Sequence, residues 1–498
     1  MEHLPEALYS AADTREADRR AMEQYGLGGG VLMERAAASA LYLLRQRYMR
    51  ARRLAVVCGP GNNGGDGYVL ARLARAMGMT VRVLSPADTS LLKGDARSAC
   101  QRWQETGEKI EPLDLGVLRE CDVVVDALFG IGVERPLDGP WCSAVEAMNA
   151  SGRPVVALDL PSGLNADTGM VEGMAVRAGM TVSFITLKAG LFTAQGREQA
   201  GQVLFQDLDV PPDVLTGLTP RARRITQNNL RGLLRPRSRP AHKGDAGRVL
   251  IVGGQPGMAG AVRLAGEAAY RAGCGLVTVA THPSHAAVVN SHRPEIISYG
   301  VLSGAELTAH AERVHAIAVG PGLVLDAWGR ELWQAALHCR QPLVVDAGAL
   351  RCLAETPVTR ENWVLTPHPG EAAMLLESTI ASVEADRFAA ARELARRYGG
   401  VCVLKGGGTL VATANEEIPW LCDRGNPGLA SGGTGDVLTG IIVSLLAQGL
   451  APRDAARLGV FVHASAADRA AEPGERGLLA ADLFEPLRTL INDLAHAD

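Results

Sequence analysis

Two glycine-rich segments of unlike design constrain the fold of this chain more than any other feature. One, RGNPGLASGGTGDVLTG over residues 424–440, crowds four glycines into residues 428–435 before an apolar run at helical spacing. The other, GPGNNGGDG over residues 59–67, follows a short apolar run. A glycine-rich loop that opens a helix lets backbone N–H groups surround an anion at the helix N-terminus. Two unlike loops in one chain predict two active sites.

Asp436 directly follows the glycines of the 424–440 segment and stands at the start of its helical pattern. A carboxylate beside a bound phosphate is repelled by it, so its presence there is costly unless it takes part in the chemistry. We therefore treat Asp436 as a candidate catalytic residue.

Length and composition narrow the class of protein. At 498 residues the chain is too long for one ordinary domain, so two or three are expected. A net charge of −4 offers no basic field for nucleic acid, and an aromatic content of 4% leaves little for base stacking. We expect small-molecule partners and no nucleic acid.

The cysteines and the N-terminus indicate the compartment. The nine cysteines form no CxxC pair and no Cys/His ligand spacing, which argues against a zinc site and against a disulfide framework. Scattered thiols fit a reducing compartment. The N-terminus lacks a basic-then-apolar signal, and no window offers the ~18 apolar residues of a membrane span. A cytoplasmic protein without a membrane partner is expected.

The first half alternates apolar strands with helical patterns. Strands are predicted at 54–58, 81–84, 123–126 and 155–159, and a helix at 69–77. Continuous rather than alternating apolar runs indicate a parallel sheet covered on both faces. The prediction is a Rossmann-like, three-layer α/β domain over residues 1–217. In such folds ligands bind beyond the carboxyl ends of the strands.

Residues 208–247 interrupt this pattern with Pro, Gly and Arg. A linker with a lead-in helix is favoured over a nucleic-acid patch, because the arginines are few and no aromatic residue is interleaved. The alternation then restarts and predicts a second α/β domain over residues 227–498. Its strands are expected at 248–252, 276–280, 316–319, 343–346, 364–366 and 401–405, and its helices at 259–272, 383–397, 436–446 and 454–470. The halves share no motif, so a fusion is favoured over a duplication.

Two aspartates end neighbouring predicted strands of the first half. Asp126 and Asp159 would converge on one crevice with the oxygen-rich 59–67 segment, which suits a cation as well as phosphate or ribose. From a strand end, Asp159 is placed to act as a general base, a role that typically contributes ~10²–10⁴-fold. The alternative is that either aspartate only caps a helix.

GPGNNGGDG, DALFGIGVERP and DLPSGL, in this order, resemble the NAD(P)H-hydrate epimerase family over roughly residues 10 to 215. The resemblance implies Asp159 as the proton-transfer residue and K⁺ held by Asn63, Asp126 and Ser162. Lys188 would be either near the reacting ring or a solvated strand-end lysine. The implied substrate contacts, besides Asp159, are Asn62, Asn63, Gly64, Gly65, Asp66, Gly130, Ile131, Gly132, Val133, Glu134, Arg135 and Pro136.

Five segments of the second half, in order, resemble the ribokinase-like superfamily. They are residues 253–261, 320–322, 366–371, 405–409 and 432–436. The resemblance implies that Asp436 is a base that deprotonates a hydroxyl for phosphoryl transfer. Positioning and electrostatics supply most of the catalysis in such chemistry.

Within that superfamily, HKGDAG, LTPHPGE, LKGGGT and NPGLASGGTGD are similar to the ADP-dependent NAD(P)H-hydrate dehydratase family over roughly residues 227 to 495. Mg²⁺ is implied as the phosphate counter-ion and ADP as co-substrate. The implied contacts to the hydrated nucleotide are Ala261, Gly322, His368 and Asp436, and those to the adenine nucleotide are Lys405, Gly406, Gly407, Gly408, Thr409 and Gly435.

Together the resemblances imply a nicotinamide nucleotide repair enzyme. It would interconvert the R and S epimers of hydrated NADH or NADPH and dehydrate the S form at the expense of ADP, giving AMP and phosphate. We also expect a homo-oligomer. Two alternatives stay open: a ribokinase-like vitamin or thiazole kinase with an accessory domain, and a non-catalytic nucleotide-binding module in the first half.

Overall fold

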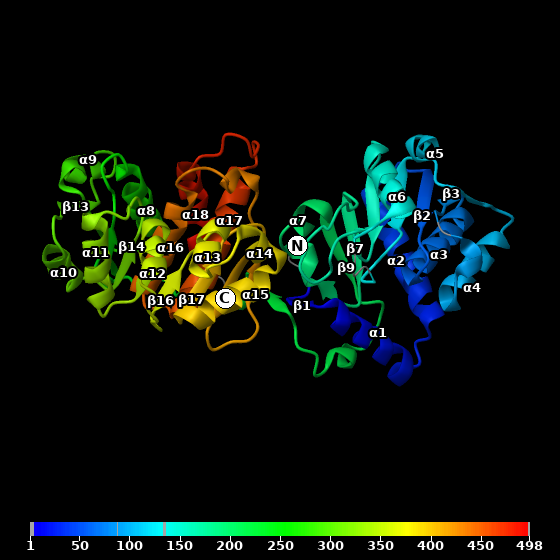
Figure 1. Ribbon diagram of the computed structural model, residues 1–498, viewed down its shortest axis with the longest axis horizontal. Coiled ribbons are helices and arrows are strands. Elements are labelled where there is room, and N and C mark those ends of the chain that lie inside the picture. Colours follow the sequence, from blue (N-terminus) through cyan, green and yellow to red (C-terminus); the bar gives the residue numbers. More distant parts are fainter. Residues whose placement is uncertain (1–3, 87, 133–135, 497–498) are drawn as a thin grey trace. The chain divides into compact units, whose positions relative to one another are not determined.

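The computed structural model describes residues 4–86, 88–132 and 136–496 (Figure 1). The chain divides into two compact units, Met1–Ala222 and Arg223–Asp498. Among the described helices, none is long and apolar enough to cross a membrane. Short 3₁₀ segments lie at Thr89–Leu91, Ala189–Phe192, Pro212–Leu215, Asn228–Leu230, Pro283–His285, Pro427–Leu429 and Ala480–Leu483.

The first unit is built on a parallel sheet in the strand order β4-β3-β2-β5-β6-β7-β9. A short parallel pair, β1 (Ala7–Tyr9) with β8 (Leu187–Lys188), lies outside that sheet. The strands are β2 Arg53–Cys58, β3 Thr80–Leu84, β4 Ile110–Glu111, β5 Val123–Ala127, β6 Val155–Leu158, β7 Met180–Phe184 and β9 Gln202–Gln206.

Helices cover both faces of this sheet. Along β2, Leu54 and Val56 enter one apolar cluster with α2, α3 and α4, while Ala55 and Val57 enter another with α5 and α6. Successive strand side chains point to opposite faces, so a continuous apolar strand serves two layers. The three-layer prediction is confirmed. The helices are α1 Ala11–Tyr25, α2 Gly29–Arg47, α3 Asn62–Ala76, α4 Gly94–Gln104, α5 Leu115–Glu120, α6 Gly139–Ala150 and α7 Gly196–Gln199.

The glycine-rich 59–67 segment is only partly a loop, because α3 already begins at Asn62. A Cβ at Gly64 would lie 2.1 Å from the Gly59 carbonyl oxygen, and one at Gly67 would lie 2.8 Å from Cys58 Sγ. These glycines therefore let the helix pack closely on strand β2, and the helix starts seven residues earlier than its apolar pattern predicted.

The second unit contains a mixed sheet in the order β13-β12-β11-β14-β15-β16-β17-β18-β19-β10. Pairing is parallel from β13 to β17, and β18 runs antiparallel to both of its neighbours. The strands are β10 Ala222–Arg224, β11 Arg248–Val252, β12 Leu276–Thr281, β13 Ile297–Gly300, β14 Ala316–Val319, β15 Leu343–Val345, β16 Trp363–Leu365, β17 Val401–Leu404, β18 Thr409–Thr413 and β19 Trp420–Cys422.

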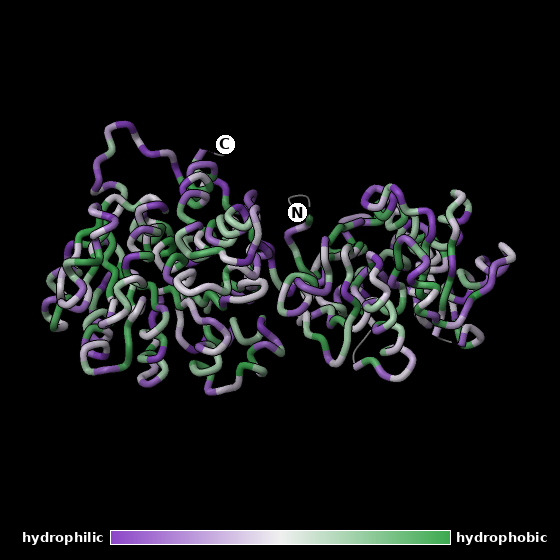
Figure 2. The backbone as a smooth tube through the Cα atoms, turned by 90° about the horizontal axis from the view of Figure 1, so that it is seen from above, coloured by the Kyte–Doolittle hydropathy of each residue, from purple (hydrophilic) through white to green (hydrophobic). Residues whose placement is uncertain are grey.

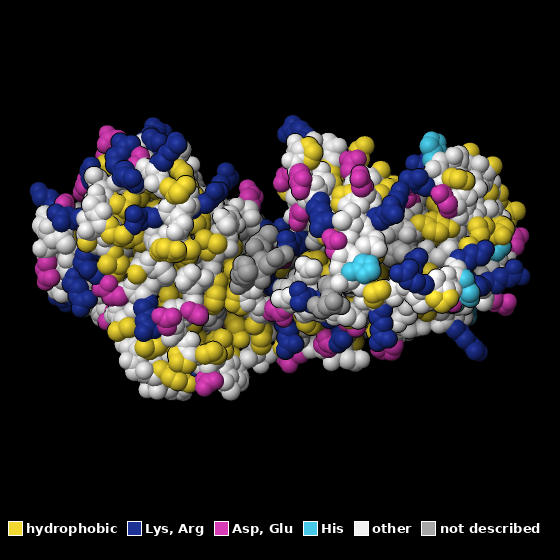
Figure 3. Space-filling model, turned by 180° about the vertical axis from the view of Figure 1, so that it is seen from behind, with side chains coloured by type: hydrophobic (Ala, Val, Ile, Leu, Met, Phe, Trp, Pro, Cys, Tyr) yellow, Lys and Arg dark blue, Asp and Glu magenta, His cyan; other side chains and the backbone are white. Residues whose placement is uncertain are grey.

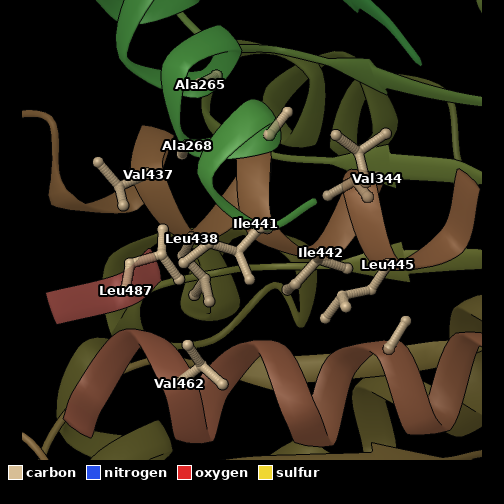
Figure 4. Packing of buried hydrophobic residues seen from close by; sticks show 14 of the residues in the cluster. Ala265, Ala268, Val344, Val437, Leu438, Ile441, Ile442, Leu445, Val462 and Leu487 are labelled. Atoms are coloured by element: carbon tan, nitrogen blue, oxygen red, sulfur yellow. The ribbon is translucent and has the colours of Figure 1, made fainter. Parts of the chain in front are cut away.

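Helix α16 (Thr434–Ala447) runs through the core of the second unit (Figure 4). It is apolar on all sides, as a fully buried helix must be, and it packs against α8 and α17. A Cβ at Gly440 would lie 2.1 Å from the Ala265 carbonyl oxygen, so glycine permits the close crossing with α8. The other helices are α8 Ala259–Arg271, α9 Ala286–Val289, α10 Gly304–Ala311, α11 Ala327–His338, α12 Ala347–Glu355, α13 Pro369–Leu375, α14 Ile380–Ala385, α15 Arg387–Tyr398, α17 Pro452–Ala470 and α18 Phe484–Ala495.

The hydropathy of the backbone follows this layering. Within each unit, the strands and central helices such as α16 supply the apolar clusters, and apolar stretches of backbone run through the interior of each unit in Figure 2. Lys and Arg side chains are interspersed with Asp and Glu over the face of each unit seen in Figure 3. This distribution agrees with the absence of a basic field in the sequence.

The predicted linker and lead-in helix at 208–247 need correction. The described residues there form 3₁₀ segments and no α-helix, and β10 lies within this stretch and pairs with β19. Arg224 on β10 is buried and forms an ion pair of 2.7 Å with Asp423. Propensity missed β10 because it is a short strand that carries a buried arginine.

The single helix expected at 383–397 is divided into α14 and α15. Asp386 separates them, and its side chain accepts a hydrogen bond of 3.0 Å from Ala389 N. An N-capping aspartate starts a new helix there, which the continuous apolar spacing did not reveal.

Two candidate active sites

The first unit contains a cavity of about 460 Å³ beyond the carboxyl ends of its central strands. Segments that follow β2, β5, β6 and β7 supply its wall, as expected for an open parallel sheet. It brings together many of the predicted site residues with groups from α1. Its lining includes Thr14, Arg15, Asp18, Asn62, Asn63, Asp66, Asp95, Gly130, Ile131, Gly132, Asp159 and Lys188.

Asp159 stands directly after β6 in an unusual backbone conformation, with φ of 64°. A non-glycine residue in the left-handed region costs about 1–3 kcal/mol and is often found at functional sites. Its Oδ1 accepts a hydrogen bond of 3.2 Å from Phe184 N and an ion-paired hydrogen bond from Lys188 Nζ. The carboxylate is thus fixed in direction at the cavity wall, and helix capping is not its role.

Lys188 is buried and not a solvated strand-end lysine. Besides pairing with Asp159, its Nζ donates to the Phe184 carbonyl oxygen at 2.9 Å and to Ser183 Oγ at 3.3 Å. Three acceptors therefore surround its three N–H donors, and the amine is held in place next to Asp159.

Asp126 and Ser162, two of the three predicted cation ligands, are in direct contact. Ser162 Oγ donates to Asp126 Oδ1 at 2.7 Å, and Ser162 N donates to Oδ2 at 2.8 Å. Burial raises the pKa of Asp126 to about 6, and its hydrogen bonds act in the opposite direction. Neither residue lines the cavity, but Ser162 Oγ accepts a hydrogen bond of 2.9 Å from the backbone N of Phe129, which does line it.

Asn63, the third predicted ligand, has a buried side-chain amide without a hydrogen-bond partner among the described residues. A Cβ on Gly130 would lie 3.7 Å from Asn63 Oδ1 and 3.2 Å from Asp159 Oδ2, so both side chains adjoin that turn. A buried amide is costly unless a bound group satisfies it. A large cation with oxygen ligands fits this requirement.

Some predicted contacts lie elsewhere or outside the described residues. Gly64 and Gly65 are buried in α3 and do not line the cavity, and Pro136 is exposed and does not line it either. Helix α3 turns these glycines toward the Gly59 carbonyl and Met33. Val133, Glu134 and Arg135 lie outside the described residues.

The second candidate site lies at the N-terminus of α16. Gly433, with φ of 92°, caps the helix, and Asp436 stands in the first turn. Burial and the nearby Asp346 raise the pKa of Asp436 to about 7, although Lys405 lowers it. A carboxyl group with a pKa near neutrality is well suited to general-base work.

Lys405 connects the carboxylates around that helix end. Its Nζ donates to Asp346 Oδ1 at 2.9 Å and lies 3.9 Å from Glu371 Oε2. Burial alone lowers the pKa of Lys405, but Asp346 and Glu371 prevail and raise it above its usual value. A Cβ on Gly435 would lie 3.5 Å from the same Nζ, so the ammonium group faces the glycine turn.

The Lys405–Thr409 loop has a backbone that only glycine adopts readily. Gly406 has φ of 134° and Gly408 has φ of 73°. Arg387 is buried beneath the loop, and its Nη2 donates to the Lys405 carbonyl oxygen at 3.0 Å. Gly406 and Gly407 are exposed to solvent.

Ala261 and Gly322 lie side by side, since a Cβ on Gly322 would be 3.2 Å from Ala261 Cβ. His368 caps α13, and its Nδ1 accepts from Gly370 N at 3.0 Å. The side chain is 56% exposed, and its Nε2 lies 3.6 Å from Glu371 Oε1. His368 therefore has a structural role and remains available to a ligand.

Comparison with known proteins assigns the two units. Residues 249–489 match the family described as NAD(P)H-hydrate dehydratase, and residues 29–190 match the family described as YjeF-related protein N-terminus. A bifunctional NAD(P)H-hydrate repair enzyme Nnr from Coxiella burnetii is 43% identical over 486 residues, 97% of this chain and 99% of the relative. The enzyme of that name from Escherichia coli is 42% identical over 490 residues, 98% of this chain and 95% of the relative. The chain belongs to the bifunctional NAD(P)H-hydrate repair enzyme family.

A solved structure supports the predicted fold of the second unit. A ribokinase-like superfamily protein from Enterococcus faecalis aligns with a TM-score of 0.51 at 29% identity, covering 55% of this chain and 96% of that chain. The family resemblance and the fold class inferred from the sequence motifs are confirmed.

Sequence reasoning missed three charged groups at the two sites. Asp346 follows β15 directly, as Asp126 ends an apolar run, and the same strand-end pattern was a usable signal. Arg387 gave no signal, because a buried arginine in a helix reads as a surface residue. Asp18 lies on α1, which precedes the residues 29–190 matched by the N-terminal family.

Proposed function

We propose that this chain repairs hydrated nicotinamide nucleotides at two separate sites. The first unit interconverts the R and S epimers of hydrated NADH or NADPH. The second dehydrates the S epimer at the expense of ADP, giving AMP and phosphate. One observation carries the proposal: full-length relatives named as repair enzymes coincide with one candidate proton-transfer carboxylate in each unit, Asp159 directly after β6 and Asp436 in the first turn of α16.

In the first unit, Asp159 is the proton-transfer residue. Its contacts with Lys188 and Phe184 N hold it at the cavity wall, which supports a role on a bound ring. The Asp159 side chain is only 14% exposed, so charge interactions there are stronger than in solvent. Asn62, Asn63, Asp66 and the Gly130–Gly132 turn supply polar contacts to the nucleotide.

In the second unit, Asp436 takes the proton of the substrate hydroxyl as that oxygen attacks the terminal phosphoryl group of ADP. The phosphorylated hydroxyl then leaves as phosphate, and loss of a ring proton restores the double bond. The α16 N-terminus and the exposed Gly406–Gly407 backbone support binding of the transferred group and the adenine nucleotide.

Two cations complete the proposal. K⁺ at the first site is supported by the unsatisfied Asn63 amide, with Asp126 and Ser162 as further oxygen donors. When bound, it would supply positive charge at this site. Mg²⁺ at the second site would neutralise the phosphates of ADP, with Asp346 and Asp436 as nearby carboxylates.

The assignment can be tested with purified protein, a mixture of hydrate epimers and ADP. Recovery of the absorbance of reduced nicotinamide, with release of inorganic phosphate, is the expected result. A vitamin or thiazole kinase, the alternative for the second unit, would instead leave a stable phosphorylated alcohol and no recovered reduced nicotinamide. That outcome would replace the proposal.

The cellular compartment, the oligomeric state and the binding partners of the protein are also proposals. A reducing, cytoplasmic compartment is supported by the free thiols of Cys58 and the other described cysteines. We propose that the protein is a homo-oligomer and acts on small molecules. We propose no nucleic-acid partner and no membrane partner. Sedimentation of the full-length chain measures the oligomeric state directly.

A further inference from the structure

The cavity of the first unit holds a carboxylate that the proposed chemistry has not used. Asp18, on α1, lines the cavity together with Asp66 and Asp159. It is half-buried, and among the described residues no hydrogen bond or ion pair holds its carboxylate. A partly desolvated carboxyl group without a protein partner, facing a ligand-sized cavity, is free to act on the ligand.

The position of Asp18 is fixed by the helix that carries it. Ser10 caps α1 and accepts a hydrogen bond of 3.0 Å from Asp13 N. One turn before Asp18 on the same helix face, Thr14 Oγ1 lies 2.7 Å from Thr186 Oγ1, and both hydroxyls are buried. Thr186 is two residues from Lys188. The helix is thus anchored beside the Asp159–Lys188 pair.

Charged groups from four elements besides α1 face this cavity. Asp66 comes from α3, Asp95 from α4, Asp159 from the end of β6 and Lys188 from β8. On α1 itself, Arg15 is exposed and donates to the Ile131 carbonyl oxygen at 3.2 Å. Lys188 is already paired with Asp159.

Among the described residues, four carboxyl groups but only two cationic side chains line this cavity, which favours a carboxyl group that keeps its proton. Burial raises the pKa of Asp18 to about 6, with Lys188 lowering it and Asp159 raising it. Burial, Asp159 and Asp18 also raise the pKa of Asp66 well above its usual value. Neighbouring carboxyl groups in a shielded site do not all ionise together. Asp18 and Asp66 therefore keep a proton to higher pH than a solvent-exposed carboxyl group does, next to the ion-paired Asp159, which is the arrangement that separates an acid from a base.

Epimerisation needs both roles. The hydroxyl group of the hydrated ring is on the carbon beside the ring nitrogen, because water adds to the electrophilic end of a protonated enamine. Inverting that carbon requires its hydroxyl to leave from one face and return on the other. One group must give a proton to the departing oxygen, and another must take a proton from the returning water.

We propose that Asp18 is the second proton-transfer residue of this site, acting as the acid where Asp159 acts as the base. This inference rests on the epimerase activity proposed above. Asp18 gives its proton to the hydroxyl oxygen, the C–O bond breaks with its electron pair on the departing water, and the nitrogen lone pair forms a C=N bond. Water then attacks the other face, the C=N pair returns to nitrogen, and Asp159 takes the released proton. Transfer of one proton from Asp159 back to Asp18 restores the site, and the opposite epimer exchanges the two roles.

The test compares wild type with Asp18→Asn, Asp18→Glu and Glu23→Gln. Glu23 is an exposed carboxylate on the same helix and serves as the matched control. Without ADP, samples enriched in one epimer are followed by chromatographic separation of R and S between pH 5 and 8, and the enzyme-free rate is subtracted. Dehydration of the S epimer with ADP reports on folding of the rest of the chain.

Asp18→Asn is expected to lower kcat for epimerisation by ~10²-fold or more while KM changes little. The wild-type rate should fall as pH rises through about 6, and this fall should vanish from the residual rate of Asp18→Asn. Asp18→Glu should recover part of the rate together with the fall, and Glu23→Gln should match wild type.

Two outcomes overturn the role of Asp18. One is an Asp18→Asn rate within a few-fold of wild type with the same pH profile. The other is that Asp18→Glu fails to recover any rate while its KM stays that of wild type, since a carboxylic acid would then be present without effect. If wild type itself shows no epimerisation above the enzyme-free rate, the proposed activity of the first unit fails, which is a separate result.

Discussion

Lys405 Nζ lies 2.9 Å from Asp346 Oδ1, and this ion pair sets the charge around Asp436. Thr439 Oγ1, on α16, donates to the other carboxylate oxygen of Asp346 at 2.8 Å, so the pair is tied to the helix that carries Asp436. Asp346 raises the pKa of Asp436 and Lys405 lowers it. The pair therefore shifts the pKa of Asp436, the proposed base, and is anchored to the helix that carries it.

Replacing Asp436 by Asn should abolish ADP-dependent recovery of reduced nicotinamide and leave epimer exchange intact. Loss of the base is expected to cost ~10²-fold or more. Because its pKa is raised from 3.8 to about 7 in the folded chain, ionisation of Asp436 lowers stability as pH rises through that interval. The Asn variant should therefore be at least as stable as wild type at pH 8, measured by thermal unfolding. Near-wild-type dehydration would contradict the assignment.

The rate of dehydration should increase with pH through about 7, as Asp436 loses its proton. Asp346→Asn removes a negative neighbour and frees Lys405, and both changes lower the pKa of Asp436, so the midpoint should move to lower pH. Single-turnover rates with saturating ADP measure this. Asp493→Asn, at an exposed carboxylate, is the control that should leave the midpoint in place. An unmoved midpoint in Asp346→Asn would show that another group titrates.

Asp159→Asn should leave nucleotide binding intact and remove the proton acceptor. With ADP and mixed epimers, the S form should be consumed at nearly the normal rate and the R form only at its slow spontaneous rate. The progress curve should be biphasic, and adding the wild-type first unit should restore the missing phase. A variant that clears both epimers like wild type would make Asp159 structural and Lys188 the next candidate.

Asn63→Leu should remove the response of the first unit to K⁺. In wild type, K⁺ should raise the temperature of its unfolding transition above that seen in a large organic cation at equal ionic strength. The variant should show no such difference, because the unsatisfied amide that fits the ion is gone. An equal K⁺ effect in both proteins would exclude Asn63 as a ligand.

Arg224→Met should destabilise the second unit by about 3–5 kcal/mol, because it leaves a buried carboxylate at Asp423 without its partner. Asp423→Leu in the same chain should return much of that loss, since the pair is then replaced by apolar side chains. Denaturant unfolding, followed by the dehydratase-unit transition, measures both. If the double variant is as unstable as the single one, the loss of stability comes from the changed packing and not from the unpaired carboxylate.

The sequence predicted well wherever a long apolar run or a glycine-rich segment dominated. Strand β2 and helix α16 are examples, because continuous runs of apolar residues predict that both elements are buried. It failed where tertiary contacts override local pattern. Arg224 on β10 is such a case, since its burial depends on a partner 199 residues away.

At the sites, the residues that bear a motif were found and their supports were not. Asp159 and Asp436 stand beside glycine turns that mark them in the sequence. Asp18 lies in a polar helix whose composition resembles any exposed helix, and only the fold shows that one face of it meets a cavity. No local sequence pattern predicts that one face of a polar helix lines a cavity.

Strand β10 also determines where the coding sequence of such a chain can be divided. The composition changes gradually across residues 208–247, but the structural boundary between the two units is sharp. Arg224 already belongs to the second unit, where it pairs with the buried Asp423. A gene for the second half that starts after residue 230 would encode a protein with a missing edge strand and an orphaned Asp423. A division of the chain into two folded parts is therefore expected to succeed only at positions before β10, where the second unit keeps both partners of the Arg224–Asp423 pair.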